Sequence, residues 1–243
     1  MSLPSSNAIL TYGRLVEEKI VKTTLYLIRH GETDWNLTGR WQGHADIPLN
    51  AIGRAQARRL AERVSTRGPR FDAIFSSDLQ RAWETASILG QATDQPPQPL
   101  PALREIDVGS WSGLTSAEVR ERDGETYARI QSGEDVARGG GERFLDLYAR
   151  VVGAVEQLTS SHAGQSLALV THGGSVRAAL LHAARDKRGI KPYRIHIGNT
   201  SITVVICADG AWELGAINDM GHLEASPQAH DMMSAPPDDT ERP

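Results

Sequence analysis

The chain has 243 residues, of which 40% are hydrophobic, and a formal net charge of −4 at pH 7. This length fits one α/β domain more easily than two, and the apolar fraction is enough for a real core. The negative balance argues against a general binder of nucleic acid or of membrane surfaces, and no apolar run approaches the ~18 residues of a membrane span. Cys207 is the only cysteine, which excludes an internal disulfide and a multi-thiolate metal site and favours a cytoplasmic location.

The two ends of the chain differ in composition from its middle. Residues 1–21 mix Ser, Pro, Asn, Glu and Lys and lack the apolar centre of a secretory signal, so we expect a flexible leader or extension there. From Glu224 onward the chain is rich in Pro, Asp and Ser, so we expect 224–243 to be a disordered tail. The interval 22–223 is then expected to form a single domain.

Hydrophobic periodicity and turn residues divide this interval into alternating strands and helices. Asn50 and Asp78 are candidate helix caps, Gly68 with Pro69 ends a helix, and Asp209-Gly210 suits the turn of a hairpin. The predicted elements are a strand at 24–28, a helix over 52–64, a strand at 71–75, a helix that carries Arg81 and Thr85, a turn-rich connection at 95–99, a charged surface helix at 114–130, an amphipathic helix over 148–158, a strand at 167–170, a helix over 175–185, and a hairpin of 200–206 and 212–217.

This alternation predicts an α/β fold of three layers, in which helices cover both faces of a mostly parallel sheet. The three glycines at 139–141 predict a mobile joint. The hairpin near 200–217 offers an edge at which a second copy of the chain could pair, so a homodimer is one option.

Two blocks carry most of the functional information, residues 27–33 (LIRHGET) and 169–174 (LVTHGG). Each is an apolar run that ends in a histidine followed by glycine, which is typical of a buried strand that ends in a sharp turn. Because open α/β sheets bind ligands at the carboxyl ends of their strands, we expect both imidazoles at that edge. Arg29 adds a bidentate donor suited to phosphate. The pattern suggests that His30 takes a phosphoryl group and that His172 stabilises it.

Five motifs occur in the order found in the histidine phosphatase superfamily, also called phosphoglycerate mutase-like, and the resemblance extends over roughly residues 22–223. A single Arg-His-Gly triplet would be weak evidence, whereas five motifs in order are strong. The motifs are residues 29–36 (RHGETDWN), 76–82 (SSDLQRA), 103–109 (LREIDVG), 140–142 (GGE) and 171–174 (THGG).

The resemblance implies catalytic roles for five residues. His30 would attack phosphorus and form a phosphohistidine, with its other ring nitrogen oriented by a backbone carbonyl of the following turn. Arg29, Arg81 and a protonated His172 would stabilise the charge on the equatorial oxygens. Glu105 would protonate the leaving alkoxide and later accept a proton from water.

Several of these residues have a simpler structural interpretation. Arg81 could be a solvated helix arginine, and Glu105 a surface carboxylate paired with Arg104. Glu142 and Asp107 are alternative acids. Glu142 is the weaker candidate, because a glutamate in a first helical turn usually interacts with the helix dipole.

Three more residues are candidates for binding the substrate. Asn36 could donate an amide hydrogen bond to phosphate, although Asn also caps turns. Gln42 resembles a position that lines the pocket in phosphatase members, and Gly173 can offer its N–H at the start of a helix. The sequence contains no Asp or Glu cluster with metal-binding spacing, and the superfamily needs no metal, so we expect no metal and no cofactor.

The acid loop favours a phosphatase over a mutase. Mutases of the superfamily carry Glu-Arg-His-Tyr-Gly there, whereas residues 105–109 read EIDVG, and 111–131 lack the lysine and the paired arginines that hold phosphoglycerate. We therefore expect a metal-independent hydrolase of a small polar phosphomonoester. A cofactor-dependent phosphoglycerate mutase is the alternative. A non-catalytic phospho-ligand binding module is disfavoured, because nucleophile, acid and second histidine are all present.

Overall fold

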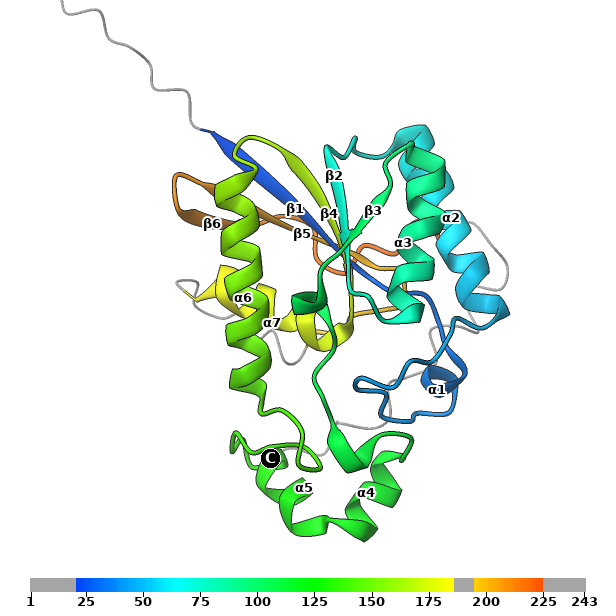
Figure 1. The fold of residues 1–243 in the computed structure, drawn as a ribbon, viewed down its shortest axis with the longest axis vertical. Coiled ribbons are helices and arrows are strands. Elements are labelled where there is room, and N and C mark those ends of the chain that lie inside the picture. Colours follow the sequence, from blue (N-terminus) through cyan, green and yellow to red (C-terminus); the bar gives the residue numbers. More distant parts are fainter. Residues whose placement is uncertain (1–20, 186–194, 225–243) are drawn as a thin grey trace, which may run out of the picture.

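The computed structural model describes residues 21–185 and 195–224, so the leader and the tail expected from the sequence lie almost entirely outside the described residues. A six-stranded sheet with the order β3-β2-β4-β1-β5-β6 forms the centre of the molecule (Figure 1). The first four strands in that order are parallel, and β5 pairs antiparallel with both β1 and β6. The strands are β1 (Lys22–Arg29), β2 (Ala73–Ser76), β3 (Pro97–Pro99), β4 (Ser166–Thr171), β5 (Ile202–Ala208) and β6 (Ala211–Leu214).

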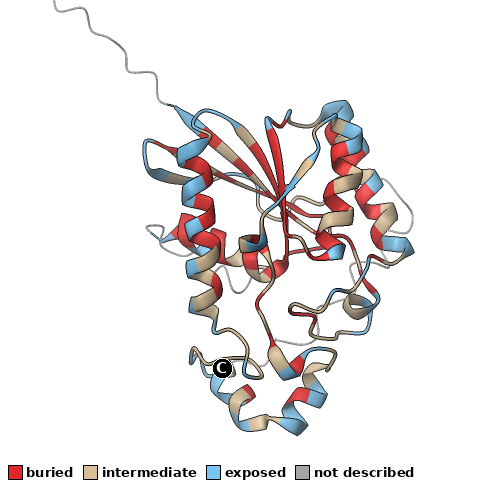
Figure 2. Ribbon diagram, viewed as in Figure 1, coloured by how far each residue is buried: buried red, intermediate tan, exposed pale blue. Residues whose placement is uncertain are grey.

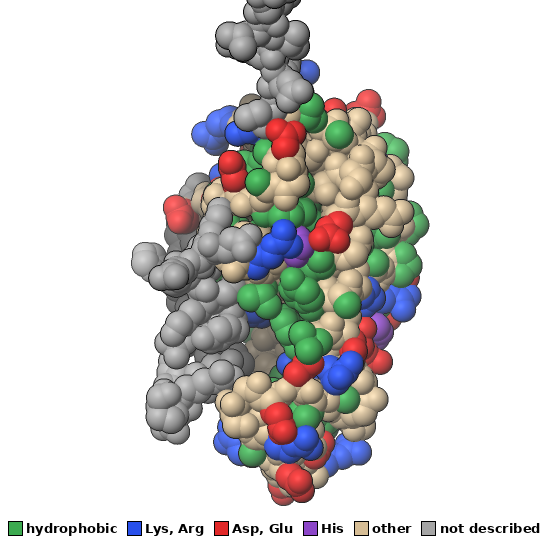
Figure 3. Space-filling model, turned by 90° about the vertical axis from the view of Figure 1, so that its left-hand side faces the viewer, with side chains coloured by type: hydrophobic (Ala, Val, Ile, Leu, Met, Phe, Trp, Pro, Cys, Tyr) green, Lys and Arg blue, Asp and Glu red, His purple; other side chains and the backbone are tan. Residues whose placement is uncertain are grey.

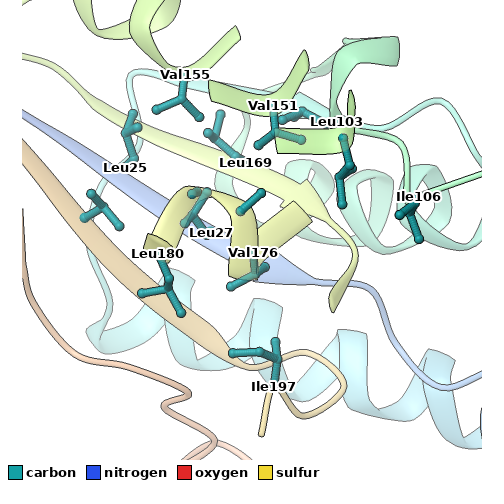
Figure 4. Packing of buried hydrophobic residues seen from close by; sticks show 14 of the residues in the cluster. Leu25, Leu27, Leu103, Ile106, Val151, Val155, Leu169, Val176, Leu180 and Ile197 are labelled. Atoms are coloured by element: carbon teal, nitrogen blue, oxygen red, sulfur yellow. The ribbon is translucent and has the colours of Figure 1, made fainter. Parts of the chain in front are cut away.

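Helices cover both faces of the sheet, which confirms the three-layer α/β architecture. One face carries α2 (Ala51–Arg67) and α3 (Gln80–Thr93), and the other carries α6 (Phe144–Ser161) and α7 (Gly173–Ala184) (Figure 1). Alternate side chains of each strand point toward opposite faces of the sheet and pack against different helical layers. Leu25 and Leu27 of β1 pack with side chains of α6 and α7 (Figure 4), whereas Ile28 packs with α2 and α3. The sheet is accordingly buried on both sides (Figure 2).

Two short helices stand apart from these layers at one end of the molecule (Figure 1). The prediction of one surface helix over 114–130 is wrong, because the helix breaks at Asp123. That residue has φ −143° and ψ 50°, and its carboxylate accepts a hydrogen bond of 3.0 Å from the indole of Trp111. The remaining helical elements are α1 (Asp34–Leu37), α4 (Ser116–Arg122), α5 (Gly124–Gln131) and the 3-10 turns Pro101–Leu103 and Gly109–Trp111.

Local predictions are corrected at two further places. The connection at 95–99 contains the edge strand β3, which tolerates proline because only one side of an edge strand must pair. Helix α3 follows Leu79, not the predicted cap Asp78, whose carboxylate binds Arg104 at 2.7 Å instead. The predicted hairpin is present as β5 and β6.

The glycine run at 139–141, predicted as a mobile joint, is a turn packed against the acid loop. Gly139 and Gly140 have positive φ, and a side chain at residue 139 would meet the backbone oxygen of Val108 at 2.5 Å. The backbone oxygen of Gly139 accepts a hydrogen bond from the N–H of Ser110. This turn therefore fixes the distance between two loops.

The molecular surface agrees with the modest net charge. On the face in Figure 3, acidic and basic side chains are interspersed rather than gathered by sign. Within residues 21–185 and 195–224, no helix is long and apolar enough to cross a membrane.

The register between β1 and β4 brings the two histidine motifs together. The strands are parallel with Arg29 opposite Thr171, and the N–H of His30 donates to the oxygen of Thr171 at 2.9 Å. His30 and His172 therefore leave adjacent strands at the same edge of the sheet. Their ring centroids lie 5.0 Å apart.

Candidate active site

His30 is buried at the end of β1, and the residue after it fixes its ring. Its Nδ1 lies 2.7 Å from the oxygen of Gly31, so in the neutral ring Nδ1 carries the proton and Nε2 the lone pair. Burial and the charges of Arg81 and Arg29 hold the pKa of His30 well below its usual 6.5. Glycine follows because a side chain at residue 31 would meet the oxygen of Gly53 at 2.5 Å. His30 is a neutral imidazole with a free basic nitrogen.

His172 is buried beside it and acts as the N-cap residue of α7. Its Nε2 lies 2.8 Å from Oγ of Ser77, and its buried Nδ1 has no hydrogen-bond partner among the described residues. Burial, followed by the charge of Arg81 and by His30, holds the pKa of His172 well below 6.5. The expectation of a protonated His172 is therefore wrong for the free site, because the low-dielectric surroundings and the nearby arginines oppose a further positive charge.

Arg29 and Arg81 flank the two rings. Arg29 donates from Nη1 to the oxygen of Ile197 at 2.5 Å, and Arg81 donates to the oxygens of Ala45 and Gly43 at 2.7 and 2.8 Å. Burial lowers the pKa of each guanidinium to about 10, and the charge of Glu105 acts in the opposite direction. Both therefore remain charged at neutral pH. The solvated interpretation of Arg81 is excluded, since the side chain is fully buried.

Glu105 is held by two backbone donors at the edge of the site. Its Oε1 accepts from the N–H of Ile106 at 2.9 Å and its Oε2 from the N–H of Gly174 at 3.1 Å. The alternative pairing with Arg104 does not occur, because that guanidinium binds Asp78. Glycine at residue 174 leaves room for this carboxylate, since a Cβ atom there would lie 2.2 Å from Oε1 of Glu105.

The loop that carries the acid is pinned by residues that the sequence analysis did not assign. The guanidinium of Arg150 donates to backbone oxygens of 102, 104 and 105 and forms a 2.8 Å ion pair with Glu142. Glu142 also accepts from the N–H of Asp107, so this alternative acid is engaged in structural contacts. Nε2 of His44 lies 2.8 Å from the oxygen of Glu105. These contacts set the position of Glu105, the candidate acid.

The three predicted binding residues lie in different local settings. Oδ1 of Asn36 accepts from the N–H of Thr33 in a capping box, so only its Nδ2 could donate to a phosphate. Gln42 is buried, and its Oε1 has no partner in the described part of the chain. Gly173 is the first residue of α7, two residues earlier than predicted, and a Cβ atom there would lie 3.9 Å from Nε of Arg29.

Two further arginines belong to this region and were missed. Nη1 of Arg177 would lie 3.5 Å from a Cβ at Gly173, and Arg177 acts electrostatically on Arg29. The i, i+4 spacing on a helix that starts at Gly173 is a signal that could have found it. Arg138 lies near enough to Glu105 for the two charges to interact, and nothing in the local sequence indicated that proximity.

Five side chains of this site share a property that points to an anion as the ligand. Each presents a buried nitrogen with no hydrogen-bond partner within residues 21–185 and 195–224, and such orphaned donors are rare in folded proteins. The start of α7 adds backbone N–H groups and the positive end of a helix dipole. An oxyanion is the ligand that satisfies this arrangement. The orphaned atoms are Nε of Arg29, Arg81 and Arg177, Nη1 of Arg138, and Nδ1 of His172.

Comparison with known proteins identifies the family. The model of the histidine phosphatase superfamily (branch 1) matches residues 25–220, which is most of the chain. The chain belongs to the histidine phosphatase superfamily. The family expected from the five motifs is confirmed. Among the described residues of this superfamily member, no group of three or more His, Cys, Asp or Glu side chains could hold a metal ion.

Relatives within the superfamily are similar over most of their length. A metal-independent phosphoserine phosphatase of Arabidopsis thaliana is 36% identical over 206 residues, 84% of each chain. A phosphoglycerate mutase-like protein 4 of the same plant is 35% identical over 87% of this chain and 92% of its own. A solved structure of a mutant phosphoserine phosphatase from Entamoeba histolytica, in complex with phosphoserine, has a TM-score of 0.73 and 30% identity, covering 82% of this chain and 99% of its own.

Proposed function

We propose that the protein is a metal-independent phosphomonoester hydrolase that acts through a phosphohistidine on His30. One observation carries the proposal: the neutral imidazole of His30 has its Nδ1 committed to Gly31, which leaves Nε2 basic beside the unpartnered nitrogens of Arg29 and Arg81. A basic nitrogen beside fixed positive charge suits in-line attack on a phosphoryl group. The names of the relatives support the same chemistry.

The reaction has two displacements. In the first, Nε2 of His30 forms a bond to phosphorus as the ester P–O bond breaks, and the protonated Glu105 transfers its proton to the leaving oxygen. In the second, water attacks the phosphohistidine and gives a proton to the Glu105 carboxylate. Phosphate leaves with the electron pair restored to Nε2. The N–H of Gly174 and that of Ile106 hold Glu105 for both steps.

Charge stabilisation comes from groups that do not need to move. Arg29 and Arg81 keep their charges throughout and direct free Nε donors at the transferring phosphoryl oxygens. His172 has a low pKa in the free site, and an arriving phosphate dianion raises that pKa because opposite charge favours the imidazolium. In the complex His172 then becomes the third cationic donor. Asn36, Gln42 and Gly173 complete the proposed phosphate contacts.

The sequence that follows the acid loop favours hydrolysis over a mutase reaction. A mutase must retain a bisphosphorylated intermediate, and the region 111–131 contains no lysine and no adjacent arginines for that purpose. The substrate in this proposal is a free small polar metabolite, encountered in the cytoplasm. The proposal needs neither nucleic acid nor membrane, and it does not depend on a homodimer.

Steady-state kinetics test the proposal. The substrates are para-nitrophenyl phosphate and 3-phosphoglycerate, the latter with and without 2,3-bisphosphoglycerate. We expect phosphate release from both, full activity in chelator, and no turnover by His30→Ala. Bisphosphate-dependent formation of 2-phosphoglycerate would establish a mutase instead. Inhibition by chelator that Mg²⁺ reverses would contradict the metal-free mechanism.

A further inference from the structure

Ser77 follows the strand that lies beside the one leading to His172. Strands β2 and β4 are parallel, with Ser76 opposite Val170, and the N–H of Ser77 donates to the oxygen of Val170 at 2.9 Å. Because these strands end at nearly the same level, the side chains that follow them meet at one edge of the sheet. Oγ of Ser77 lies 2.8 Å from Nε2 of His172, and both residues are fully buried. The fold therefore gives one side of the His172 ring a fixed hydroxyl partner.

The hydroxyl of Ser77 has one hydrogen to donate and two lone pairs that accept. It accepts from the N–H of Leu79 at 3.3 Å. Within residues 21–185 and 195–224, its other hydrogen bond joins it to Nε2 of His172. Its backbone is held separately, since the oxygen of Ser77 accepts from Oγ of Ser76 at 2.8 Å. Among the described residues, the hydrogen of the Ser77 hydroxyl thus has one acceptor, Nε2 of His172.

This arrangement selects one tautomer of the neutral His172 ring. If the ring proton lay on Nε2, the hydrogen of Ser77 would have no acceptor, and the lone pair of Nδ1 would also be unpaired, because Nδ1 is buried without a partner in the described part of the chain. If the proton lies on Nδ1, Ser77 donates to Nε2 and only the Nδ1–H stays unpaired. Since each unpaired buried polar group is costly, the second tautomer is favoured. An oxyanion beside Nδ1 then satisfies the remaining donor.

We infer that Ser77 is a positioning residue that keeps the proton of neutral His172 on Nδ1, so that the ring offers the phosphoryl group a donor before it gains any charge. The inference rests on the proposed phosphatase function and deepens it on the phosphate side of the same site. The other tautomer would direct a lone pair at the phosphoryl oxygens, which repel it. When the bound dianion favours the imidazolium, the added proton binds Nε2, the hydrogen of Ser77 turns away, and the second lone pair of its oxygen accepts from Nε2–H.

Two serine variants isolate this contact. Ser77→Ala removes the hydroxyl that faces Nε2 of His172. Ser76→Ala is the matched control, because Ser76 is equally buried one residue earlier and its Oγ donates to a backbone oxygen instead of contacting a histidine ring. Each variant removes one oxygen atom and one buried hydrogen bond at the end of β2.

The tautomer is measured in the free protein by ¹⁵N NMR with ¹⁵N-labelled histidine at pH 7. Correlations within the ring separate a protonated from an unprotonated nitrogen, and His172→Gln identifies the signals of this ring by their loss. The ring is neutral at this pH, because burial holds the pKa of His172 well below 6.5. We expect the proton on Nδ1 in wild type and in Ser76→Ala, and partly or wholly on Nε2 in Ser77→Ala. A proton on Nε2 in wild type, or one tautomer in all three proteins, would overturn the inference.

Phosphate binding and turnover measure the consequence for the site. Ser77→Ala should weaken binding of inorganic phosphate and lower kcat/KM, each by about 3- to 10-fold, the range for one neutral hydrogen bond. The loss in kcat/KM should be equal for para-nitrophenyl phosphate and an alkyl phosphate, because the two esters share the phosphoryl group that His172 is proposed to contact. Ser76→Ala should match wild type. A loss confined to the alkyl ester, or equal losses in both variants, would contradict the role of Ser77.

The outcomes separate this role from the proposed function. If wild type hydrolyses both esters while Ser77→Ala matches it in tautomer and in kcat/KM, the role of Ser77 fails and the phosphatase proposal stands. If wild type hydrolyses no ester, the phosphatase proposal fails, whichever tautomer the NMR spectrum shows.

Discussion

Gly174→Ala tests the role of Glu105 without removing the carboxylate. The added Cβ would lie 2.2 Å from Oε1 and 3.2 Å from Cδ of Glu105. The carboxylate is the free end of a flexible side chain, whereas residue 174 belongs to the backbone of α7, so Glu105 is the group that moves. It then loses the hydrogen bonds from the N–H groups of residues 174 and 106. The variant therefore displaces the proposed acid and leaves Arg29 and Arg81 in place.

The expected magnitudes for stability and catalysis differ. Alanine gains about 1 kcal/mol of helix propensity over glycine, while hydrogen bonds to a charged group contribute about 1.5–3 kcal/mol each. Two such hydrogen bonds, less the gain from alanine, give an expected net loss of about 2–5 kcal/mol in the free energy of unfolding. General acid catalysis contributes about 10²- to 10⁴-fold, so kcat/KM for an alkyl phosphate should fall by at least about 100-fold.

The assay compares two leaving groups. Para-nitrophenolate leaves without much help from an acid, so its release should fall by less than about 10-fold, in contrast to the alkyl ester. Gly153→Ala is the matched control, because residue 153 is exposed on α6 and a Cβ atom there meets open space. Equal losses in kcat/KM on both esters would refute the reasoning, because kcat/KM excludes the hydrolysis of the phosphohistidine, in which Glu105 also acts, and the disturbance would then lie in the phosphate site. An unchanged rate on the alkyl ester would mean that Glu105 is not the acid.

Three further predictions concern charge and pH. Arg81→Met should raise the pKa of His30 toward its usual value, because a nearby positive charge is removed. NMR titration of the imidazole measures this pKa. The absence of an upward shift would mean that burial alone sets it. Arg150→Met should lower the free energy of unfolding by about 2–3 kcal/mol, measured by urea unfolding, and should slow the turnover of esters with poor leaving groups, measured by steady-state kinetics. Unchanged values would show that Arg150 does not hold the acid loop. Burial lowers the pKa of His222 to about 4, so the unfolded chain binds more protons below pH 6.5 and stability falls as the pH drops. At pH 5 this loss is about 2 kcal/mol, and unfolding of His222→Asn at pH 7 and 5 should lack it; an equal loss in the variant would contradict the assignment.

Local pattern was enough to predict the main elements of the fold. Apolar runs and helical spacing placed the sheet and the helical layers, and the parallel strands β1 and β4 brought His30 and His172 together as expected. The errors occur where a distant contact decides the outcome. The break at Asp123 depends on Trp111, and Asp78 binds Arg104 instead of capping α3. Strand β3 was missed because its prolines are typical of a turn.

The sequence predicted the site residues that lie directly at the ends of strands. It did not predict properties that depend on how deeply a side chain is buried. The protonated His172 expected from the sequence was wrong for the free site, because only the fold shows how completely the ring is buried. Arg150 contacts the acid loop across more than forty residues, and Arg138 comes near enough to interact electrostatically with Glu105 where the glycine turn packs against that loop. Neither contact has a local sequence signal. Arg177 is the exception, since its spacing from Gly173 was available.

Trapping the phosphoenzyme tests the central claim most directly. Wild-type protein is mixed with ³²P-labelled phosphomonoester, quenched rapidly in alkali, which preserves phosphohistidine, and digested for peptide mapping. The proposed mechanism predicts label on His30, chased by unlabelled substrate, and no label in His30→Ala. Turnover without trapped label, label on His172, or hydrolysis by His30→Ala at the wild-type rate would contradict it.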